Sequence, residues 1–195
     1  MLKNKLKSHN LILVSASPRR QFLLKELDVD FRVEVRAVDE SYPLDLKPSE
    51  ITTYLSRLKA SDFTDLAEND ILITSDTIVW HKEKVLGKPK DFGEAKAMLQ
   101  ELSGGMHEVF SSVCFTSKSF QKTVTDVTQV WFKELSNEEI DYYIKTYKPF
   151  DKAGSYGIQE WIGYIGIEKI HGCYFNVMGL PLPLVYKTLT EIVQP

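Results

Sequence analysis

Residues 11–20 read LILVSASPRR and place a buried strand directly before a helix. The apolar run at residues 11–14 is short and continuous, which is typical of a buried strand. Ser17 and Pro18 then form a strong helix start, because serine is a favourable N-cap and proline suits the first helical position. The first secondary-structure pair of the chain is therefore a strand that leads at once into a helix.

Helix and strand patterns alternate along the rest of the chain. Residues 31–38 alternate apolar and charged side chains as a half-exposed strand does, a helix is predicted from Pro48, and Ser136 with Glu139 forms the capping box of another. Because the two kinds of element are interspersed, we expect one α/β domain over residues 1–195, with helices on both faces of a sheet. The other predicted elements are a strand at 71–80 interrupted by a polar triplet, a hairpin turn at 81–84, a helix at 92–102, antiparallel strands at 107–116 and 123–132, paired strands at 164–170 and 174–178, and a helix from Pro181.

Composition excludes several classes of protein. The net charge is −3 and the pI is about 5.8, whereas a nucleic-acid-binding domain usually has a basic excess. No apolar run approaches the roughly 18 residues of a membrane helix, and the run at 11–14 is too short for a signal peptide. Cys114 and Cys173 lie far apart and form no metal or redox motif. We therefore expect buried free thiols, a cytoplasmic location, and neither nucleic acid nor a membrane as a partner.

The first candidate site is the helix start at residues 15–20. Arg19 and Arg20 belong to the first helical turn, where a cation opposes the helix dipole by about 0.3–1 kcal/mol. This placement is favourable when an anion binds there, since backbone N–H groups, serine hydroxyls and guanidinium groups converge on a phosphate. The alternative is a surface helix whose arginines face solvent.

The second candidate site is the triplet Ser75-Asp76-Thr77, which lies within a strongly apolar stretch. A carboxylate in such surroundings is costly unless it is paired, hydrogen-bonded or bound to a metal. Asp76 is therefore a candidate metal ligand or general base. The alternative is a turn residue or a bulge at the end of a strand.

Four weaker features each have an ordinary structural explanation as well. Lys88 at a tight bend, Lys59 on an amphipathic helix and Glu40 in a loop can each simply face solvent. The loop at residues 151–159 has two glycines that permit close backbone approach, and the amide of Gln159 could read the edge of a base. Metalloprotease, serine-hydrolase and P-loop motifs do not occur.

Together these segments resemble the Maf family of nucleotide pyrophosphatases over residues 11–192. An ordered set of this many segments is specific to the family, whereas each segment alone would be weak evidence for it. The resemblance implies a Maf/ITPase-like fold, with a mixed sheet and two lobes that flank a nucleotide cleft. The segments that carry it are Ser15-Ala16-Ser17-Pro18-Arg19-Arg20, Glu40, Lys59-Ala60, Ser75-Asp76-Thr77, Gly87-Lys88-Pro89, Ser103-Gly104, the loop from Asp151 to Gln159, and Asn176-Val177-Met178-Gly179-Leu180-Pro181.

The resemblance also implies an activity, which is hydrolysis of a nucleoside triphosphate to the monophosphate and pyrophosphate with Mg²⁺ or Mn²⁺. The sequence Tyr156-Gly157-Ile158-Gln159 is similar to the branch that acts on dTTP and UTP, with clearance of modified nucleotides as a related role. Asp76 matches the proton acceptor and, with Glu40, the metal-binding carboxylates. The other matching positions are Arg19, Thr77 and Gln159 for base selection, and Ser15, Arg20, Lys59 and Lys88 for the phosphates.

Two positions depart from the family pattern. Ser75 stands where alanine is common, and it is expected to add a hydroxyl beside the catalytic acid. Glu160-Trp161 follows Gln159 where a small residue is usual, and this change is expected to alter the rim of the nucleoside pocket.

The family's link to septum formation and cell-division arrest leaves a second function open, that of a nucleotide-binding regulatory protein. The sequence also leaves open whether the chain forms a homodimer.

Overall fold

The computed structural model describes residues 1–193, which divide into two compact units. The first unit comprises Met1–Asp76, Ser111–Asp126 and the chain from Gly179 onward, and the second comprises Thr77–Phe110 and Val127–Met178. No helix among the described residues is long and apolar enough to cross a membrane.

The first unit is built on three parallel strands, β1 (Asn10–Val14), β2 (Phe31–Glu34) and the first part of β3 (Asp70–His81). β1 lies between the other two, with Leu13 level with both Val33 and Ile73. The predicted strand at residues 11–14 is confirmed, and its side chains are buried because both faces of the sheet are covered. β2 is shorter than predicted, since it ends at Glu34.

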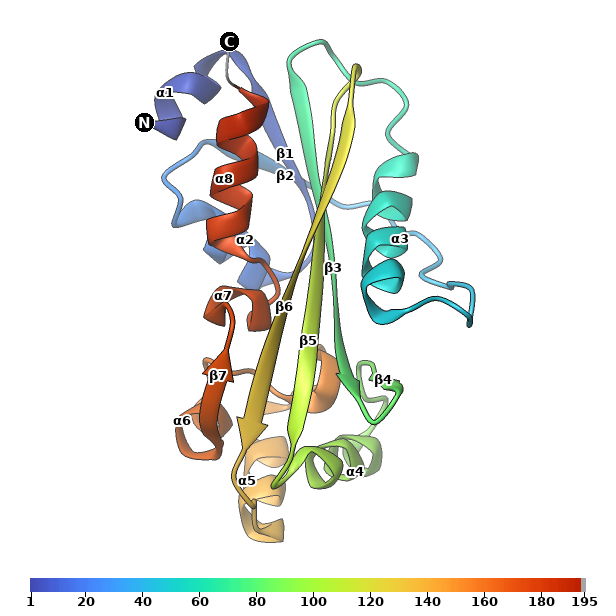
Figure 1. Ribbon diagram of the computed structural model, residues 1–195, viewed down its shortest axis with the longest axis vertical. Coiled ribbons are helices and arrows are strands. Elements are labelled where there is room, and N and C mark those ends of the chain that lie inside the picture. The colour runs from blue at the N-terminus through green and yellow to red at the C-terminus, as the bar shows by residue number, and fades with distance from the viewer. Residues whose placement is uncertain (194–195) are drawn as a thin grey trace. The chain divides into compact units, whose positions relative to one another are not determined.

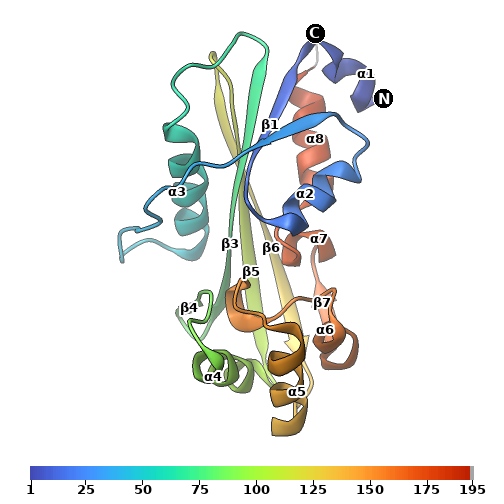
Figure 2. The same ribbon diagram turned by 180° about the vertical axis from the view of Figure 1, so that it is seen from behind.

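Helices cover both faces of the sheet in the first unit, as the mixture of elements predicts. Figures 1 and 2 show α3 (Pro48–Ser61) on one face and α2 (Pro18–Lys25) and α8 (Leu182–Ile192) on the other. Two short helical segments, α1 (Leu2–Lys5) and η1 (Leu6–Ser8), precede β1. α2 begins with Ser17 as N-cap and Pro18 at its first position, as predicted, although the Ser17 side chain makes no capping hydrogen bond.

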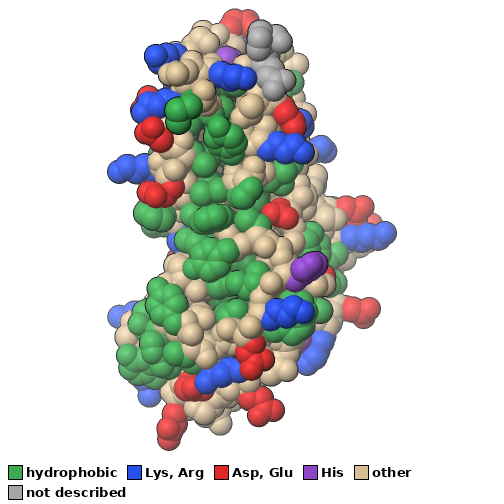
Figure 3. All heavy atoms as spheres, turned by 60° about the vertical axis from the view of Figure 1, so that its left-hand side comes forward, with side chains coloured by type: hydrophobic (Ala, Val, Ile, Leu, Met, Phe, Trp, Pro, Cys, Tyr) green, Lys and Arg blue, Asp and Glu red, His purple; other side chains and the backbone are tan. Residues whose placement is uncertain are grey.

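One large apolar side chain on α2 is exposed. Leu23 and Leu24 are buried, whereas Phe22 is 56% exposed, because the helix is short and turns only part of its surface inward. Tyr186 on α8 is also exposed, and Figure 3 shows hydrophobic side chains at the surface of the face that carries these two helices. Apolar side chains contribute much of the surface of ordinary proteins.

The second unit joins antiparallel strands to a cluster of helices. β4 (Lys84–Leu86) pairs with the end of β3, and β7 (Ile167–His171) pairs with the end of β6 (Gln121–Phe132). β5 (Met106–Thr116) lies between β3 and β6 in the strand order. Parallel and antiparallel pairs together make the sheet mixed, as expected. The helical segments of this unit are α4 (Phe92–Leu102), α5 (Asn137–Tyr147), η2 (Ala153–Ser155), α6 (Trp161–Gly166) and α7 (Tyr174–Val177).

The core of the second unit forms where these helices pack on the strands. Leu99 and Leu102 of α4, Ile140 and Ile144 of α5, and Val130 of β6 are among its buried side chains. The Ser136 hydroxyl accepts a hydrogen bond from the backbone N–H of Glu139, and the Glu139 carboxylate accepts one from the N–H of Ser136, so the predicted capping box is present.

Two predictions about strands are wrong. β3 runs without interruption from Asp70 to His81, so Ser75-Asp76-Thr77 is part of the strand rather than a break in it. Residues 164–170 and 174–178 do not pair, because 161–166 form α6, β7 pairs with β6 instead, and 174–177 form α7. The aromatic and β-branched residues of this region are typical of strands, so its local composition favoured the wrong assignment.

Candidate functional site

The carboxyl end of β1 lies beside the middle of β3 in the first unit, where the parallel pairing of the two strands ends. Val14 is level with Thr74, so Ser15 and Ser75 follow the last paired residues of the two parallel strands. The chain leaves β1 through α2 on one face and reaches β3 through α3 on the other face. Open α/β sheets bind ligands at this kind of position, where connections from neighbouring strands diverge to opposite faces.

The turn from β1 into α2 is held by local hydrogen bonds. The backbone N–H of Ser17 donates to the Ser15 hydroxyl at 3.2 Å, and the Gln21 amide donates to the Ser15 carbonyl at 3.0 Å. Ser15 is buried, whereas Arg19 is half-buried in the first turn of α2. Ser15 and the first helical turn therefore have a defined geometry beside the middle of β3.

Arg20 is anchored by backbone carbonyls of two other segments. Its Nε donates to the Gly179 carbonyl and its Nη1 to the Ser75 carbonyl, both at 2.8 Å. Burial lowers the pKa of the Arg20 guanidinium, and the Asp76 carboxylate opposes that shift. An arginine remains protonated in proteins, so these contacts fix a positive charge beside Ser75 in the middle of β3. Arg20 is thus not the solvent-facing arginine of the alternative interpretation.

Lys59 connects the two predicted metal-binding carboxylates. Its Nζ lies 2.6 Å from Oδ1 of Asp76 and 3.1 Å from Oε1 of Glu40. Asp76 is only 6% exposed, while the Glu40 side chain is 50% exposed. The buried carboxylate is therefore paired, as the cost of burying an isolated charge requires.

Strand alternation separates the side chains of Ser75 and Asp76. Successive side chains of a strand point to opposite faces, and Thr74 and Asp76 both contact residues of α3, namely Ser56 and Lys59. The Ser75 hydroxyl instead points to the Gly179 carbonyl, at 3.5 Å. The expectation that this hydroxyl lies beside the Asp76 carboxylate is therefore wrong.

The remaining predicted site residues belong to the second unit. Thr77 follows Asp76 directly along β3 and is half-buried, and Lys88 is exposed. The backbone N–H of Gly154 donates to the Gly87 carbonyl at 3.1 Å, which brings the loop at 151–159 beside the bend that carries Lys88. A Cβ atom on Gly154 would lie 2.9 Å from a methyl group of Val79, so this loop also packs against β3.

Gln159 combines a backbone contact with an unsatisfied side chain. Its carbonyl accepts a hydrogen bond from the Tyr164 hydroxyl at 2.5 Å. Its amide oxygen is buried and has no hydrogen-bond partner within residues 1–193. Buried polar atoms usually have partners, so this oxygen is suited to accept a hydrogen bond from a ligand.

Glu40 and Asp76 are a suitable pair of ligands for Mg²⁺ or Mn²⁺. Such ions prefer oxygen, and Mg²⁺ commonly binds one or two carboxylates together with substrate phosphates and water. Among residues 1–193, no three His, Cys, Asp or Glu side chains gather into a metal-binding group. The carboxylate pair therefore fits a metal whose remaining ligands come from the substrate and solvent.

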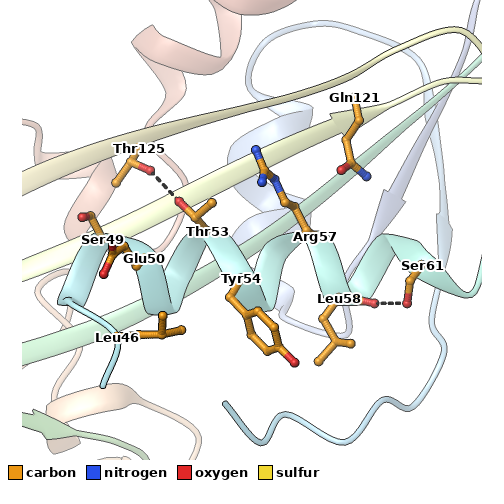
Figure 4. A pocket seen from close by; sticks show the side chains of 10 residues that line it. All are labelled: Leu46, Ser49, Glu50, Thr53, Tyr54, Arg57, Leu58, Ser61, Gln121 and Thr125. Carbon is orange, nitrogen blue, oxygen red and sulfur yellow. Dashed lines mark hydrogen bonds between the residues drawn. The ribbon is translucent and has the colours of Figure 1, made fainter. Parts of the chain in front are cut away.

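A groove of about 740 Å³ lies away from these residues, between α3 and the start of β6. Figure 4 shows Thr53 of α3 beside Thr125 of β6 and Arg57 on the side of α3 that faces Gln121, whereas Tyr54 points away from β6. None of the predicted site residues lines this groove. Lys59, which is also on α3, does not line the groove and contacts Asp76 instead.

Comparison with known proteins identifies the family. Residues 10–192 match the family described as Maf-like protein. The chain belongs to the Maf family. It is 56% identical over 194 residues to a dTTP/UTP pyrophosphatase of Christiangramia forsetii, covering 99% of both chains. It is 53% identical to a protein of the same name from Flavobacterium johnsoniae, covering 99% of this chain and 100% of the relative.

Solved structures support the fold independently of close sequence similarity. A HAM1 protein from Coxiella burnetii superposes with a TM-score of 0.50 at 15% identity, covering 94% of this chain and 99% of the other. The Ham1 protein of Staphylococcus aureus gives the same TM-score at 13% identity, with the same coverage. At this level of identity the likeness concerns the fold alone, and it agrees with the α/β Maf/ITPase-like architecture.

Sequence reasoning missed several residues that hold the site of this Maf chain. The Ser75 carbonyl accepts hydrogen bonds from both Arg20 and Lys59, the latter at 3.5 Å. Tyr143 of α5 contacts Glu160, and Lys152 is buried rather than reaching solvent. Backbone carbonyls leave no mark in a sequence, but a buried position for Tyr143 was detectable from its helical spacing with Ile140 and Ile144.

Proposed function

We propose that this Maf chain hydrolyses dTTP and UTP to the nucleoside monophosphate and pyrophosphate. The observation that carries the proposal is buried Asp76, which is paired with Lys59 and adjoins anchored Arg20 beside the carboxyl end of β1. The names of the full-length relatives point to the same reaction. Modified pyrimidine nucleotides that share the same base edge are further candidate substrates.

Asp76 is proposed as the general base. Its carboxylate would orient a water molecule and accept its proton as the oxygen attacks the α-phosphorus. The bond from the α-phosphorus to the bridging oxygen then breaks, and pyrophosphate leaves. Lys59, at 2.6 Å, holds the carboxylate in place, so that its orientation is set before the substrate arrives.

Cations would offset the charge of the triphosphate. Arg20 and Lys59 are proposed to stabilise negative charge that develops on the phosphate oxygens, with Lys88 assigned the same role from the second unit. Ser15 would donate its hydroxyl hydrogen to a phosphate oxygen near the helix start. Because Arg20 is anchored by two carbonyls, its charge needs little reorganisation during the reaction.

Glu40 and Asp76 would hold a divalent cation, Mg²⁺ or Mn²⁺. A bound cation of this kind neutralises phosphate charge and polarises the phosphorus–oxygen bonds. Turnover should therefore disappear when EDTA removes divalent ions and return when Mg²⁺ is added in excess. Full activity in EDTA would contradict the assignment.

Gln159, Arg19 and Thr77 are proposed to select the base. Uracil and thymine present an N3–H donor between two carbonyl oxygens, whereas N3 of cytosine is an acceptor. The buried, unpartnered amide oxygen of Gln159 supports acceptance of a hydrogen bond from that N3–H. A site with such a partner rejects a base that would leave it unpaired.

The decisive experiment is pyrophosphate release from a panel of dTTP, UTP, CTP, GTP and 7-methyl-GTP with Mg²⁺. We expect turnover of dTTP and UTP, and loss of at least about 10³-fold in kcat for Asp76→Asn, which keeps the shape of the side chain but cannot accept the proton. Ser75→Ala is the matched control, since it changes the neighbouring residue on the opposite face. If Asp76→Asn kept wild-type turnover, the general-base assignment would be wrong.

The same panel tests a regulatory role. Tight nucleotide binding without turnover of any member would support a nucleotide-binding regulatory protein instead of an enzyme. We place the reaction in the cytoplasm, in accord with the free thiols of buried Cys114 and half-buried Cys173 and with the nucleotide pool that the reaction requires.

A further inference from the structure

Glu160, which directly follows Gln159, contacts two elements of the second unit at once. Its Oε1 lies 3.1 Å from Nζ of Lys152, and its Oε2 accepts a hydrogen bond from the Tyr143 hydroxyl. Lys152 is almost fully buried, with its side chain 9% exposed, and its Nζ also lies 2.7 Å from Asp151. The ion pair between Glu160 and Lys152 therefore links the two ends of the loop at 151–160.

Tyr143 links this contact to the middle of the loop. Its hydroxyl accepts a hydrogen bond from the backbone N–H of Gly157 at 3.0 Å while it donates to Glu160. Burial raises the pKa of the Tyr143 hydroxyl, and the Glu160 carboxylate raises it further. The hydroxyl consequently remains protonated at neutral pH and keeps its hydrogen for Glu160.

Gly157 packs directly against the Glu160 side chain. A Cβ atom at position 157 would lie 2.8 Å from the carboxyl carbon of Glu160, closer than side chains approach. The backbone N–H of Glu160 also donates to the Gly157 carbonyl at 2.9 Å. Gln159 thus lies within a short closed turn whose two ends are fixed by the same carboxylate.

We propose that Glu160 is a positioning residue for base selection, which holds the Gln159 amide in the orientation that favours uracil and thymine. The substrate class in this proposal rests on the proposed function. The support is the closed turn around Glu160 together with the buried amide oxygen of Gln159, which has no partner within residues 1–193. A side chain that leaves a buried oxygen unsatisfied is unfavourable by itself, so its surroundings must hold it there.

Loss of this constraint has a specific consequence for selectivity. If the turn relaxes, the Gln159 amide can rotate and present its NH₂ group where its oxygen had been. An NH₂ group there would pair with N3 of cytosine as well as the oxygen pairs with N3–H of uracil. Discrimination between UTP and CTP should therefore fall, whereas the chemical step at Asp76 should not change.

The test compares Glu160→Ala, Glu160→Gln and Tyr143→Phe with the wild-type protein. Asp141→Asn is the matched control, because it removes another ion pair of α5, with Lys96 at 2.7 Å, that does not involve the loop. For Glu160→Ala and Tyr143→Phe we expect about a tenfold rise in the KM for UTP, little change in kcat, and about a tenfold fall in the ratio of kcat/KM for UTP over CTP. Glu160→Gln retains an acceptor for Tyr143 and should restore most of the selectivity.

Hydrogen exchange and nucleotide-binding measurements test the role of Glu160 without relying on turnover. The Gly157 amide should exchange faster in Tyr143→Phe and Glu160→Ala, and binding of UMP over CMP should lose the same selectivity as catalysis. Faster exchange with unchanged selectivity in all three variants would overturn the proposal, because the contacts would then be merely structural. If the wild-type protein turned over no nucleotide, the proposed function would fail. The binding measurement would then still test Glu160: loss of selectivity for UMP over CMP in the variants would support its positioning role, and unchanged selectivity would overturn that role.

Discussion

At the scale of single residues, Lys59 balances the negative charge of two carboxylates in the first unit. Its ammonium group contacts both Asp76 and Glu40. Lys59→Met keeps much of the side-chain length but leaves the buried carboxylate without its cation, and removing one partner of a buried pair costs about 3 kcal/mol. We expect a lower free energy of unfolding in urea, and a fall in kcat of at least about 100-fold because phosphate charge is no longer offset.

The control for Lys59→Met is Lys122→Met, which breaks an exposed ion pair with Glu191. Exposed pairs contribute at most about 1 kcal/mol, so this variant should remain close to wild type in both measurements. Equal effects of the two substitutions would contradict a special role for Lys59.

Ser75 gives the opposite expectation, although it adjoins Asp76 in the sequence. Its hydroxyl faces the Gly179 carbonyl at 3.5 Å rather than the Asp76 carboxylate. Ser75→Ala should therefore leave kcat for dTTP within about twofold of wild type and change the free energy of unfolding by less than about 1 kcal/mol, the value of a modest hydrogen bond. A large loss of kcat with a normal unfolding curve would show that the hydroxyl takes part in the reaction.

At the scale of elements, the hairpin that joins β3 to β4 contains removable backbone strain. Lys82 and Glu83 have φ values of 45° and 61°, a left-handed conformation that favours asparagine and glycine in tight hairpin turns. Replacing the pair by Asn-Gly should raise the free energy of unfolding by about 1 kcal/mol, because glycine has no Cβ clash in that region. Urea denaturation at neutral pH measures the difference.

Ser119→Gly is a suitable control for the hairpin prediction. Ser119 lies in the turn between β5 and β6 and does not have a positive φ. Glycine there adds flexibility to the unfolded chain without relieving strain, so stability should fall slightly or stay the same. Stabilisation by both changes would indicate a cause other than left-handed geometry.

Elements with strong local signals were predictable from the sequence. The helix Phe92–Leu102 has the predicted bounds, and the capping box of Ser136 and Glu139 forms as expected. The region from residue 161 to 178 was not predictable, because a short strand there pairs with distant β6 rather than with its sequence neighbour. Register with a distant strand is decided by tertiary packing, which a local pattern does not contain.

At the scale of the whole molecule, buried His107 should make stability depend on pH. It is 1% exposed and its Nε2 contacts the Tyr156 hydroxyl at 2.7 Å. Burial, and to a lesser degree the charge of His81, lowers the pKa of His107 from 6.5 to about 3. The unfolded chain therefore takes up a proton below pH 6.5 that the folded protein does not, and stability falls as pH drops from 6.5 towards 3.

This contribution can be isolated by substitution. Between pH 7 and pH 5 the wild-type protein should lose about 2 kcal/mol through His107, at 1.36 kcal/mol for each pH unit below 6.5. His107→Gln cannot titrate, so its free energy of unfolding, although lower at pH 7, should fall less over the same interval. Parallel losses in the two proteins would show that His107 is not the responsible group.

The sequence by itself determined the family and the α/β class, and it supplied the candidate site residues. These follow from local signals, such as the strand and helix start at residues 11–20, and from an ordered set of short motifs. Only the tertiary structure decided how charge is distributed among those residues. It pairs Lys59 with two carboxylates, anchors Arg20 on the carbonyls of Ser75 and Gly179, and turns Ser75 away from Asp76. Such contacts join segments distant in the chain and often involve backbone atoms, which are the same at every position and cannot be distinguished in a sequence.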